Sequence, residues 1–376
     1  MAHIRDSCGM YGAERVILTL ARHISRQEFD VTLIALQGPE GKSKKFIRNA
    51  AAMGIDVQPV TVRGRLDSRA LLEVRKILRE RSIRILHSHD FKSNFYGIVA
   101  SIGLPVARLV TAHGSTRDSF LKKAYLFLDE KVSYRFFDRI IAVSDRLRGE
   151  LEQKGVSRRK IEVIPNAIDL SLMVSARNGS GDPESERRVG ERYVFGMIGR
   201  LYPDKGHRFF LEAFARLAKD YPFVTAKIVG GGPEKIEISQ LVTRLGLSGK
   251  VDLCGEREDM DVVYHGLDAV VIPSLREGLP YVLLESMALK IPVIATAVGD
   301  IPTLVRDGET GWLVPPGDTD AIEKGMRELI ASPEKARQMA ELGSDAVNRQ
   351  CSPRTMIERL ESVYRQAIIN GERLAR

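Results

Sequence analysis

Short apolar segments alternate with longer segments of helical periodicity along the whole chain. In the first half, the segments with the length and apolar content of strands are Ala2–Arg5, Val31–Leu36, Asp56–Val60, Ile83–His87, Ala107–Thr111, Arg139–Val143 and Ile161–Pro165. In the second half they are Tyr193–Ile198, Val224–Val229, Lys250–Leu253, Ala269–Ile272, Pro292–Ala295 and Gly311–Leu313. Strands that alternate with helices predict βα units and parallel sheets, so the predicted fold class is α/β.

Helical patterns fill the intervals between these strands. They include Ala13–His23, Ser68–Arg81, Gly206–Asp220, Ile236–Leu245, Asp259–Gly266, Tyr281–Leu289, Thr319–Ala331 and Pro333–Asn348. A polar stretch rich in Gly, Ser and charged residues, 175–192, separates the two series and has the composition of a linker. We therefore predict two doubly wound, Rossmann-like domains at residues 1–170 and 193–352, a linker at 171–192 and a final helical segment at 353–376.

Two doubly wound domains have a predictable place for a ligand. Open α/β sheets bind ligands beside the carboxyl ends of their strands. If those ends face each other, the site is an inter-domain cleft. Dehydrogenases, epimerases and glycosyltransferases all share this arrangement, so the architecture alone does not select among them.

Composition indicates the class of protein and the compartment in which to expect it. The 376 residues are 44% hydrophobic and 28% charged, as in an ordinary globular enzyme. No apolar run has the length of a membrane span, and the start, MAHIRDSCGM, lacks the apolar core of a signal peptide. We therefore expect a cytoplasmic protein. Cys8, Cys254 and Cys351 are scattered singly, which supports neither a disulfide framework nor a zinc site.

Charge is distributed unevenly between the two halves. Residues 1–169 hold 30 Lys and Arg against 19 Asp and Glu, a net charge of +11, whereas the remainder has a net charge of −3. The basic half suits an anionic membrane face or a phosphate-bearing acceptor, and no nucleic-acid module accompanies it. Arg117–Arg139 mixes basic and aromatic residues as an interfacial helix does, which predicts peripheral contact with the inner face of the membrane. Solvated basic helix faces explain the same charge equally well.

The most informative stretch is Pro273–Glu285, PSLREGLPYVLLE, between a strand and a helix. Amides near Gly278 and Leu279 would lie at the positive end of that helix, where an anion such as diphosphate binds. Glu285, about a turn inside the helix, is suited to accept both hydroxyls of a ribose. The alternative interpretation is a capped helix on which Glu277 and Glu285 are surface residues.

A second segment, Ile198–Phe214, also follows a strand. Arg200 comes at the end of the strand, and a turn carries Lys205 before the next helix. Two cations in this position suit a diphosphate, because charge-assisted hydrogen bonds to phosphate are strong. The alternative is a surface pair with Asp204, which would contribute little.

Glycines follow several other strands. Backbone at Gly231 and Gly255, with Arg257 nearby, would accept a flat nucleobase, although ordinary tight turns explain these residues equally well. The loop before the first helix holds Gly9 and Gly12. Their spacing is not the dinucleotide fingerprint, but such a loop is able to approach a phosphate or a sugar.

Three histidines lie at predicted strand ends. His113 follows a strand, precedes Gly114 and is the strongest functional candidate among the histidines. His87 and His89 share one face of a strand end, and with Asp90 they suggest a metal site. No third ligand has a suitable spacing, so we predict no metal site and expect His87 to hold a loop by hydrogen bonds.

Together these segments resemble the retaining glycosyltransferases of family 4, which have the GT-B fold. The matching residues are Gly12–Arg15, His89, Thr111–His113, Val143–Ser144, Pro165–Asp169, Gly199–Arg200, Lys205–Gly206, Gly230–Pro233, Glu277–Pro280, Glu285, Gly299, Asp307–Gly308 and Thr310–Gly311. They follow the order of the family over nearly the whole chain, which makes the joint match specific.

The resemblance implies roles for the candidate residues. Glu277 would contact hydroxyls of the donor sugar, with His113 beside that sugar. Arg200 and Lys205 would bind the phosphates, together with the amides that follow Glu277, and Glu285 would bind the ribose. Family members usually need no bound metal, so no cofactor is expected beyond the nucleotide-sugar substrate.

The resemblance also implies an arrangement of domains. The first domain would be the acceptor side, the second would bind the nucleotide sugar, and the last helix would return to the first domain. The loop Gly9–Gly12 would face the donor phosphate and the acceptor. Here the chain departs from the family, because two adjacent glycines are common where this sequence has Gly9-Met10-Tyr11-Gly12.

The functional hypothesis is transfer of a hexose or related sugar from a UDP- or GDP-sugar to a glycan, lipid-linked or small-molecule acceptor, with retained configuration. Such a reaction would serve the synthesis of cell-surface polysaccharide or glycolipid. A glycosidase-like pair of Glu277 and Glu285 would need carboxyls about 5–9.5 Å apart across one bond, which a loop-and-helix pair serves poorly. The remaining alternatives are a nucleotide-sugar epimerase or hydrolase of the same fold, and a catalytically silent nucleotide-binding relative.

Overall fold

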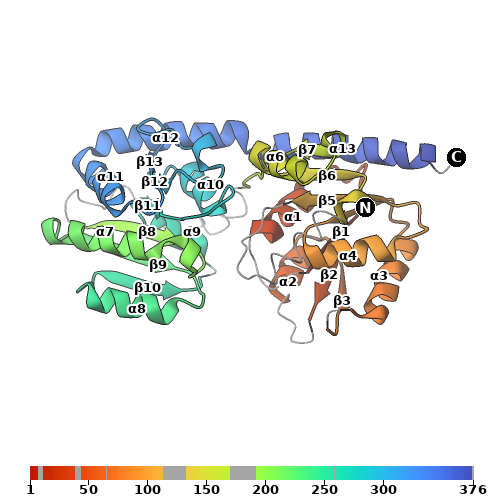
Figure 1. Ribbon diagram of the computed structural model, residues 1–376, viewed down its shortest axis with the longest axis horizontal. Coiled ribbons are helices and arrows are strands. Elements are labelled where there is room, and N and C mark those ends of the chain that lie inside the picture. Colours follow the sequence, from red (N-terminus) through yellow and green to blue (C-terminus); the bar gives the residue numbers. More distant parts are fainter. Residues whose placement is uncertain are drawn as a thin grey trace. The chain divides into compact units, whose positions relative to one another are not determined.

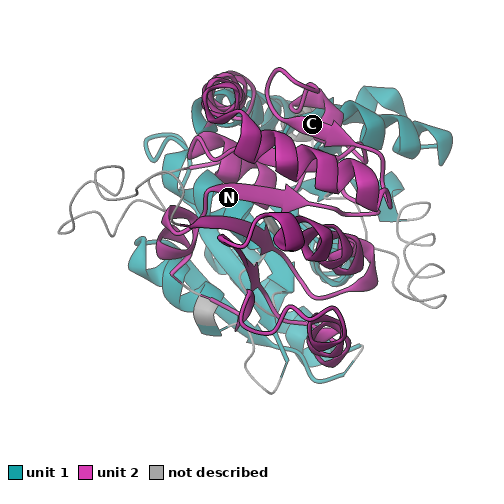
Figure 2. Ribbon diagram, turned by 90° about the vertical axis from the view of Figure 1, so that its left-hand side faces the viewer, with its two compact units in different colours: residues 1–167, 353–376 teal, residues 168–352 magenta. Residues whose placement is uncertain are grey.

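The structure is a computed structural model and describes residues 1–6, 12–38, 44–64, 66–112, 133–169, 192–257 and 259–374. The chain divides into two compact units (Figure 2). Unit 1 comprises Met1–Ala167 and Pro353–Arg376, and unit 2 comprises Ile168–Ser352. Each unit has its own parallel sheet, so the predicted class of two Rossmann-like α/β domains is confirmed.

Unit 1 contains a seven-stranded parallel sheet in the order β3-β2-β1-β4-β5-β6-β7. The strands are β1 (Ala2–Asp6), β2 (Thr32–Gln37), β3 (Asp56–Thr61), β4 (Ile85–Ser88), β5 (Ala107–Ala112), β6 (Arg139–Ala142) and β7 (Ile161–Val163). The helices are α1 (Gly12–His23), α2 (Lys44–Ala52), α3 (Ser68–Glu80), α4 (Phe91–Ala100), α6 (Asp145–Gln153) and α13 (Pro353–Leu374), shown in Figure 1.

The first strand shows how a period of two residues distributes side chains in unit 1. Ala2 and Ile4 join the apolar core formed with α3 and α4. His3, between them, points to the opposite face, where its ring lies beside that of His87. Helix α13 packs on that second face against α1, β4 and β5. The carboxyl-terminal segment therefore completes the core of unit 1.

Unit 2 contains a six-stranded parallel sheet in the order β10-β9-β8-β11-β12-β13. The strands are β8 (Tyr193–Ile198), β9 (Val224–Val229), β10 (Val251–Gly255), β11 (Ala269–Ile272), β12 (Val293–Thr296) and β13 (Trp312–Val314). The helices are α7 (His207–Asp220), α8 (Lys235–Arg244), α9 (Met260–His265), α10 (Tyr281–Ala288), α11 (Thr319–Ala331) and α12 (Pro333–Gln350). Predicted and observed bounds agree fully for β8, β9 and β11.

Strand β11 explains why the sheet of unit 2 is apolar on both faces. Ala269 and Val271 enter a core shared with α7, α8 and α11. Val270 and Ile272 enter a second core shared with α9, α10 and α12. A strand buried on both faces reads as a continuous apolar run, and this is why the sequence revealed it.

Candidate functional site

The predicted donor residues of unit 2 gather at one edge of its sheet. Parallel strands all end at the same edge, and β8 and β11 lie side by side where the strand order reverses, the usual place for a ligand in an open α/β sheet. After the strand ends come Arg200 and Lys205 (β8), Gly231 (β9), Gly255 and Arg257 (β10), and Glu277, Gly278 and Leu279 (β11).

Glu277 and Lys205 form the central ion pair of this edge. Lys205 Nζ donates to Glu277 Oε1 at 2.5 Å, and the two side chains are 16% and 10% exposed. Ser274 Oγ donates to the same oxygen at 2.9 Å. The carboxylate is thus fixed by a cation from one strand–helix connection and by a hydroxyl from its own. Ser274 was not predicted, although a hydroxyl two residues after the end of a strand was a usable signal.

Backbone contacts hold these two connections together. Leu275 N donates to Asp204 O at 2.8 Å. Gly206 has φ of 74°, and a Cβ on it would lie 2.1 Å from Pro273 O, so only glycine allows the Lys205 turn to pack so closely on the exit from β11. On the other side, Asp300 N donates to Gly278 O at 3.0 Å. The positions of Lys205 and Glu277 therefore depend on each other.

Arg200 lies against an aromatic ring in the same strand–helix connection. Its guanidinium carbon lies 4.7 Å from the centre of the Tyr202 ring, in a cation–π contact. Within the ranges that the structure describes, no carboxylate lies within 4.0 Å of Arg200. The alternative surface pair of Arg200 or Lys205 with Asp204 is not formed among these residues, and Lys205 pairs with Glu277 instead.

The start of α10 borders open space. A Cβ on Gly278 would meet no atom within 4 Å. Pro280 is the N-cap residue, and no side chain caps the helix there. Leu279 packs on the second core of unit 2, which anchors the turn. Uncapped backbone at the positive end of a helix, beside open space, is suited to an anion.

Glu285 is buried in the helix that follows. Its carboxylate is 3% exposed, and Oε2 accepts a hydrogen bond of 2.5 Å from the hydroxyl of Tyr264 in α9. Tyr264 was not predicted, because it lies on a different helix and nothing in its spacing connects it to Glu285. Arg257, in the predicted nucleobase region, donates to Asp259 at 2.7 Å at the surface.

At the carboxyl edge of the unit 1 sheet, the charged side chains pair with one another. Arg5 Nε donates to Glu14 Oε1 at 3.0 Å, and Arg5 Nη1 donates to His89 O at 2.8 Å. Glu14 is fully buried. Asp90 lies 3.5 Å from Arg5 and caps α4 together with Ser93. Burial and the nearby Asp90 raise the pKa of the Asp6 carboxyl above its ordinary value.

Two predicted residues of unit 1 fall outside the described residues, namely Gly9 and His113. The predicted linker, apart from Arg192, and the part of the predicted interfacial segment before Ser133 also lie outside them. Gly12 is described as the first residue of α1.

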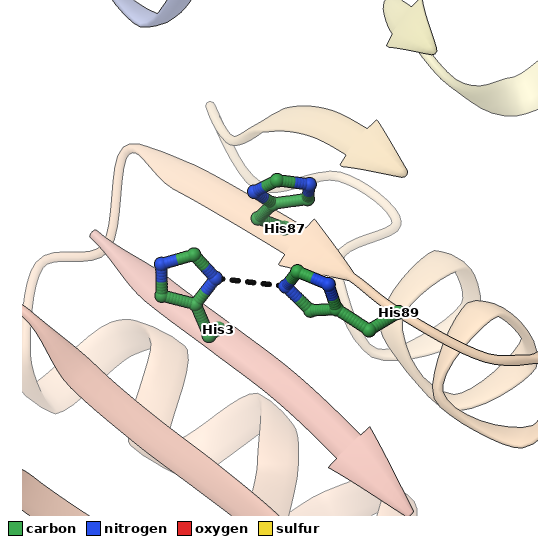
Figure 3. A group of neighbouring side chains, drawn as sticks. All are labelled: His3, His87 and His89. Atoms are coloured by element: carbon green, nitrogen blue, oxygen red, sulfur yellow. Dashed lines mark hydrogen bonds between the residues drawn. The ribbon is translucent and has the colours of Figure 1, made fainter. Parts of the chain in front are cut away.

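The expectation that His87 and His89 lack a third histidine was wrong. His3 lies beside them, because β1 and β4 pair with His3 opposite His87, and one ring nitrogen from each of the three lies within 4.8 Å of the others. Figure 3 shows the three side chains along the two strands. The strand register that brings them together cannot be read from spacing along the chain.

Hydrogen bonds join these histidines to one another and to the core of unit 1, whereas His3 Nε2 is buried and has no hydrogen-bond partner among the described residues. His3 Nδ1 and His89 Nε2 are 2.9 Å apart, and both nitrogens of His87 are bonded, to Tyr364 and Thr111. The rings of His87 and His89 have centroids 4.3 Å apart and are tilted by 32° to each other. Burial lowers the pKa of His3 to about 3, so the His3 ring is uncharged at neutral pH. The arrangement is that of a hydrogen-bonded core.

Comparison with known proteins identifies the two halves. The glycosyltransferase family 4 model matches residues 10–172, and the glycosyl transferases group 1 model matches residues 181–345. The chain is 27% identical over 341 residues to an Escherichia coli UDP-Gal:alpha-D-GlcNAc-diphosphoundecaprenol alpha-1,3-galactosyltransferase, covering 86% of this chain and 85% of that protein. It is 25% identical to the capsular polysaccharide biosynthesis glycosyltransferase CapM of Staphylococcus aureus, covering 93% of both.

A solved structure has the same fold over nearly the whole chain. The crystal structure of Anabaena Alr3699/HepE in complex with UDP superposes with a TM-score of 0.81 and 22% identity, over 97% of this chain and 99% of that one. Among the described residues, no helix combines the length and hydropathy of a membrane span. The chain therefore belongs to the glycosyltransferases that join a family 4 amino-terminal half to a group 1 carboxyl-terminal half, and it is a transferase with the GT-B fold.

Proposed function

We propose that the protein transfers a hexose or related sugar from a UDP- or GDP-sugar to a glycan or lipid-linked acceptor, with retained anomeric configuration, in the synthesis of a cell-surface polysaccharide or glycolipid. The observation that carries this proposal is the group of Arg200, Lys205 and Glu277 around the open start of α10. It offers two cations and helix amides to a diphosphate, and a fixed carboxylate to the sugar attached to it.

The names of relatives agree with this chemistry. The Escherichia coli relative is named for a UDP-galactose donor and a diphosphoundecaprenol-linked acceptor. Anabaena HepE has been crystallised with UDP-glucose. A Mycolicibacterium smegmatis relative, 27% identical over 69% of this chain, is named as GDP-mannose-dependent. The donor base differs among such relatives, so both UDP- and GDP-sugars are candidates.

In the proposed reaction, charge stabilisation is the main contribution of the protein. As the bond between sugar and phosphate breaks, negative charge grows on the diphosphate, and Arg200, Lys205 and the start of α10 stabilise it. The acceptor oxygen attacks from the same face, and its proton passes to the leaving phosphate. Glu277, held by Lys205 and Ser274, would orient the sugar hydroxyls.

The two glutamates do not resemble a glycosidase pair. Glu277 is bonded to the ammonium of Lys205, and Glu285 is buried against Tyr264 in α9. Glu285 is better suited to bind a ribose from within the helix. Glu285→Ala should therefore weaken binding of UDP or GDP in calorimetry. A loss of turnover with full nucleotide affinity would contradict the ribose role.

A peripheral membrane contact is a further part of the proposal. Arg135 and Phe136, at the end of the predicted interfacial segment, are exposed, and Phe136 is 53% exposed. A basic and aromatic surface suits anionic lipid. Flotation with vesicles of phosphatidylglycerol and phosphatidylcholine tests this contact. Binding that falls with added salt supports it, and no binding to either lipid removes it.

The function itself is tested by nucleotide release from UDP-, GDP- and ADP-sugars, with and without polyprenyl-diphosphate-linked and free glycan acceptors. We expect release that depends on an acceptor, and a product whose anomeric configuration, read by NMR, equals that of the donor. Equal release without any acceptor would indicate a hydrolase. Conversion of one nucleotide sugar into another would indicate an epimerase, and an inverted product would contradict retention.

A further inference from the structure

His87 lies at the centre of a buried chain of hydrogen bonds in unit 1. Its Nδ1 is 2.7 Å from the hydroxyl of Tyr364, and its Nε2 is 2.7 Å from Thr111 Oγ1. His87 and Tyr364 are completely buried, and Thr111 is nearly so. Water therefore does not compete for these groups, and a lost partner would leave a buried polar atom unsatisfied.

If the Tyr364 hydroxyl is the donor, the hydrogen bonds of His87 allow only one arrangement of protons. A neutral histidine has one N–H and one bare nitrogen. When Tyr364 donates to Nδ1, the proton of His87 is on Nε2 and is donated to Thr111. Burial raises the pKa of Tyr364 well above its ordinary value, so the hydroxyl keeps its proton. Removal of the tyrosine hydroxyl therefore changes what His87 offers to Thr111.

The two residues bonded to His87 lie on elements that are far apart in sequence. Tyr364 belongs to α13, which begins at Pro353, directly after the last residue of unit 2. The edge of its ring contacts Phe29, with centroids 5.8 Å apart. Thr111 is the second-last residue of β5, two positions before His113. The hydrogen bonds of His87 thus connect α13, the helix that follows unit 2 in the sequence, with β5, the strand that precedes His113.

We propose that Tyr364 and His87 are positioning residues for the carboxyl end of β5 and that they act through Thr111. The structural part of this inference stands on the three hydrogen-bonded side chains alone. Its effect on turnover rests on the proposed function and on the role beside the donor sugar that the family resemblance implies for His113. A small displacement of a group near the reacting atoms is enough to lower the rate strongly.

The test compares two tyrosines of the same unit. Tyr364→Phe removes the hydroxyl bonded to His87. Tyr96→Phe is the matched control, because the Tyr96 hydroxyl is bonded to Asp67 N at 2.9 Å and its buried ring lies in the core formed with α3 and α4, on the opposite face of the sheet. Hydrogen exchange of a peptide spanning residues 107–116 and steady-state turnover are measured for both variants.

We expect Tyr364→Phe to speed exchange at the end of β5 and to lower kcat by about tenfold, with the donor KM within about twofold of wild type. Tyr96→Phe should do neither. Thr111→Val should lower kcat as much as Tyr364→Phe does, whereas Thr111→Ser keeps the hydroxyl and should retain wild-type kcat. The double variant Tyr364→Phe with Thr111→Val should have a kcat close to that of either single variant, because both substitutions break the same series of hydrogen bonds.

Two results would overturn the inference. One is exchange at the end of β5 that is unchanged in Tyr364→Phe, whatever the activity. The other is a kcat of Tyr364→Phe equal to that of Tyr96→Phe in an enzyme whose wild type turns over. A wild type that releases no nucleotide from any donor would count against the proposed function instead, and the exchange experiment would still decide on the hydrogen-bonded chain.

Discussion

The carboxyl edges of the two sheets hold their charges differently. In unit 2, Lys205 pairs with Glu277 beside the open backbone of Gly278, and Arg200 has no carboxylate within 4.0 Å among the described residues. In unit 1, Arg5 is surrounded by Glu14, Asp90 and the carbonyl of His89. One edge leaves the charge of Arg200 without a carboxylate partner among the described residues, whereas the other neutralises its own arginine.

This difference separates a binding role from a supporting role. Lys205 and Glu277 are 16% and 10% exposed and lie beside the open backbone of Gly278, so a ligand could reach them, whereas Glu14 is fully buried against Arg5. A buried pair is different, since removal of one partner leaves a charge without compensation. Substitutions at the unit 2 edge should therefore reduce activity more than stability, and those at the unit 1 edge the reverse.

The largest effect on turnover is expected for Glu277→Gln. The amide keeps the shape of the side chain but loses the charge that Lys205 and the donor sugar would use, so kcat should fall by about 10²–10³. The free energy of unfolding should fall by less than the about 3 kcal/mol that a broken buried pair costs, because Lys205 and Glu277 are 16% and 10% exposed. Steady-state kinetics and urea unfolding measure the two quantities.

Glu309→Gln serves as the control, because Glu309 pairs with Arg306 at the surface of the same unit. A kcat for Glu277→Gln that matches this control would show that the Glu277 carboxylate has no part in the reaction.

Glu14→Gln tests the unit 1 edge and should mainly affect stability. The change leaves the Arg5 guanidinium partly buried without its closest carboxylate, at a cost of about 3 kcal/mol in the free energy of unfolding. The exposed pair of Asp56 and Arg81 gives the control, since Asp56→Asn should cost less than about 1 kcal/mol. Equal costs in urea unfolding would contradict the supporting role of Arg5 and Glu14.

A backbone substitution tests whether close packing holds the Lys205 turn. Gly206→Ala would place a Cβ 2.1 Å from Pro273 O at φ of 74°, and Gly308→Ala has φ of 71° with no atom within 4 Å. Left-handed backbone alone costs about 1–2 kcal/mol in an alanine. Gly206→Ala should exceed Gly308→Ala by at least about 1 kcal/mol in thermal unfolding and should also weaken UDP or GDP binding. Similar values for both would mean that the turn relaxes freely.

The smallest effect is a pH dependence of stability at His207, next to Lys205. Burial, and then the nearby Lys205, lower its pKa to about 4 from an ordinary 6.5. The unfolded chain therefore binds the proton first as pH falls, so stability is full above pH 6.5 and is lost toward pH 4. His207→Leu should remove about 2 kcal/mol of the stability difference between pH 7 and pH 5. Identical pH profiles of variant and wild type in urea unfolding would contradict the shift.

Whether the residues at each sheet edge could be predicted depends on how far apart along the sequence the contacting residues lie. Arg200, Lys205 and Glu277 each come within a few residues after an apolar strand, and parallel strands end at one edge, so their meeting was predictable. Tyr264 was missed because it reaches Glu285 from another helix, although only 21 residues separate them.

The polar groups of unit 1 depend on register and on the returning helix. His3 meets His89 from 86 residues away through the pairing of β1 with β4, and Tyr364 meets His87 from 277 residues away. A shift of β1 by one residue would turn His3 to the other face of the sheet. Local patterns do not encode such a register, and this is why the third histidine was not predicted.

The central claim is that the carboxyl edge of unit 2 binds the diphosphate of a nucleotide sugar through Arg200 and Lys205. The most direct measurement is isothermal titration of UDP and of GDP into wild type, into Arg200→Ala combined with Lys205→Ala, and into Arg208→Ala, whose exposed partner is Glu212. Two lost charge-assisted bonds should weaken the preferred nucleotide by at least about a hundredfold, with Arg208→Ala at wild-type affinity. Unchanged affinity in the double variant would contradict the account.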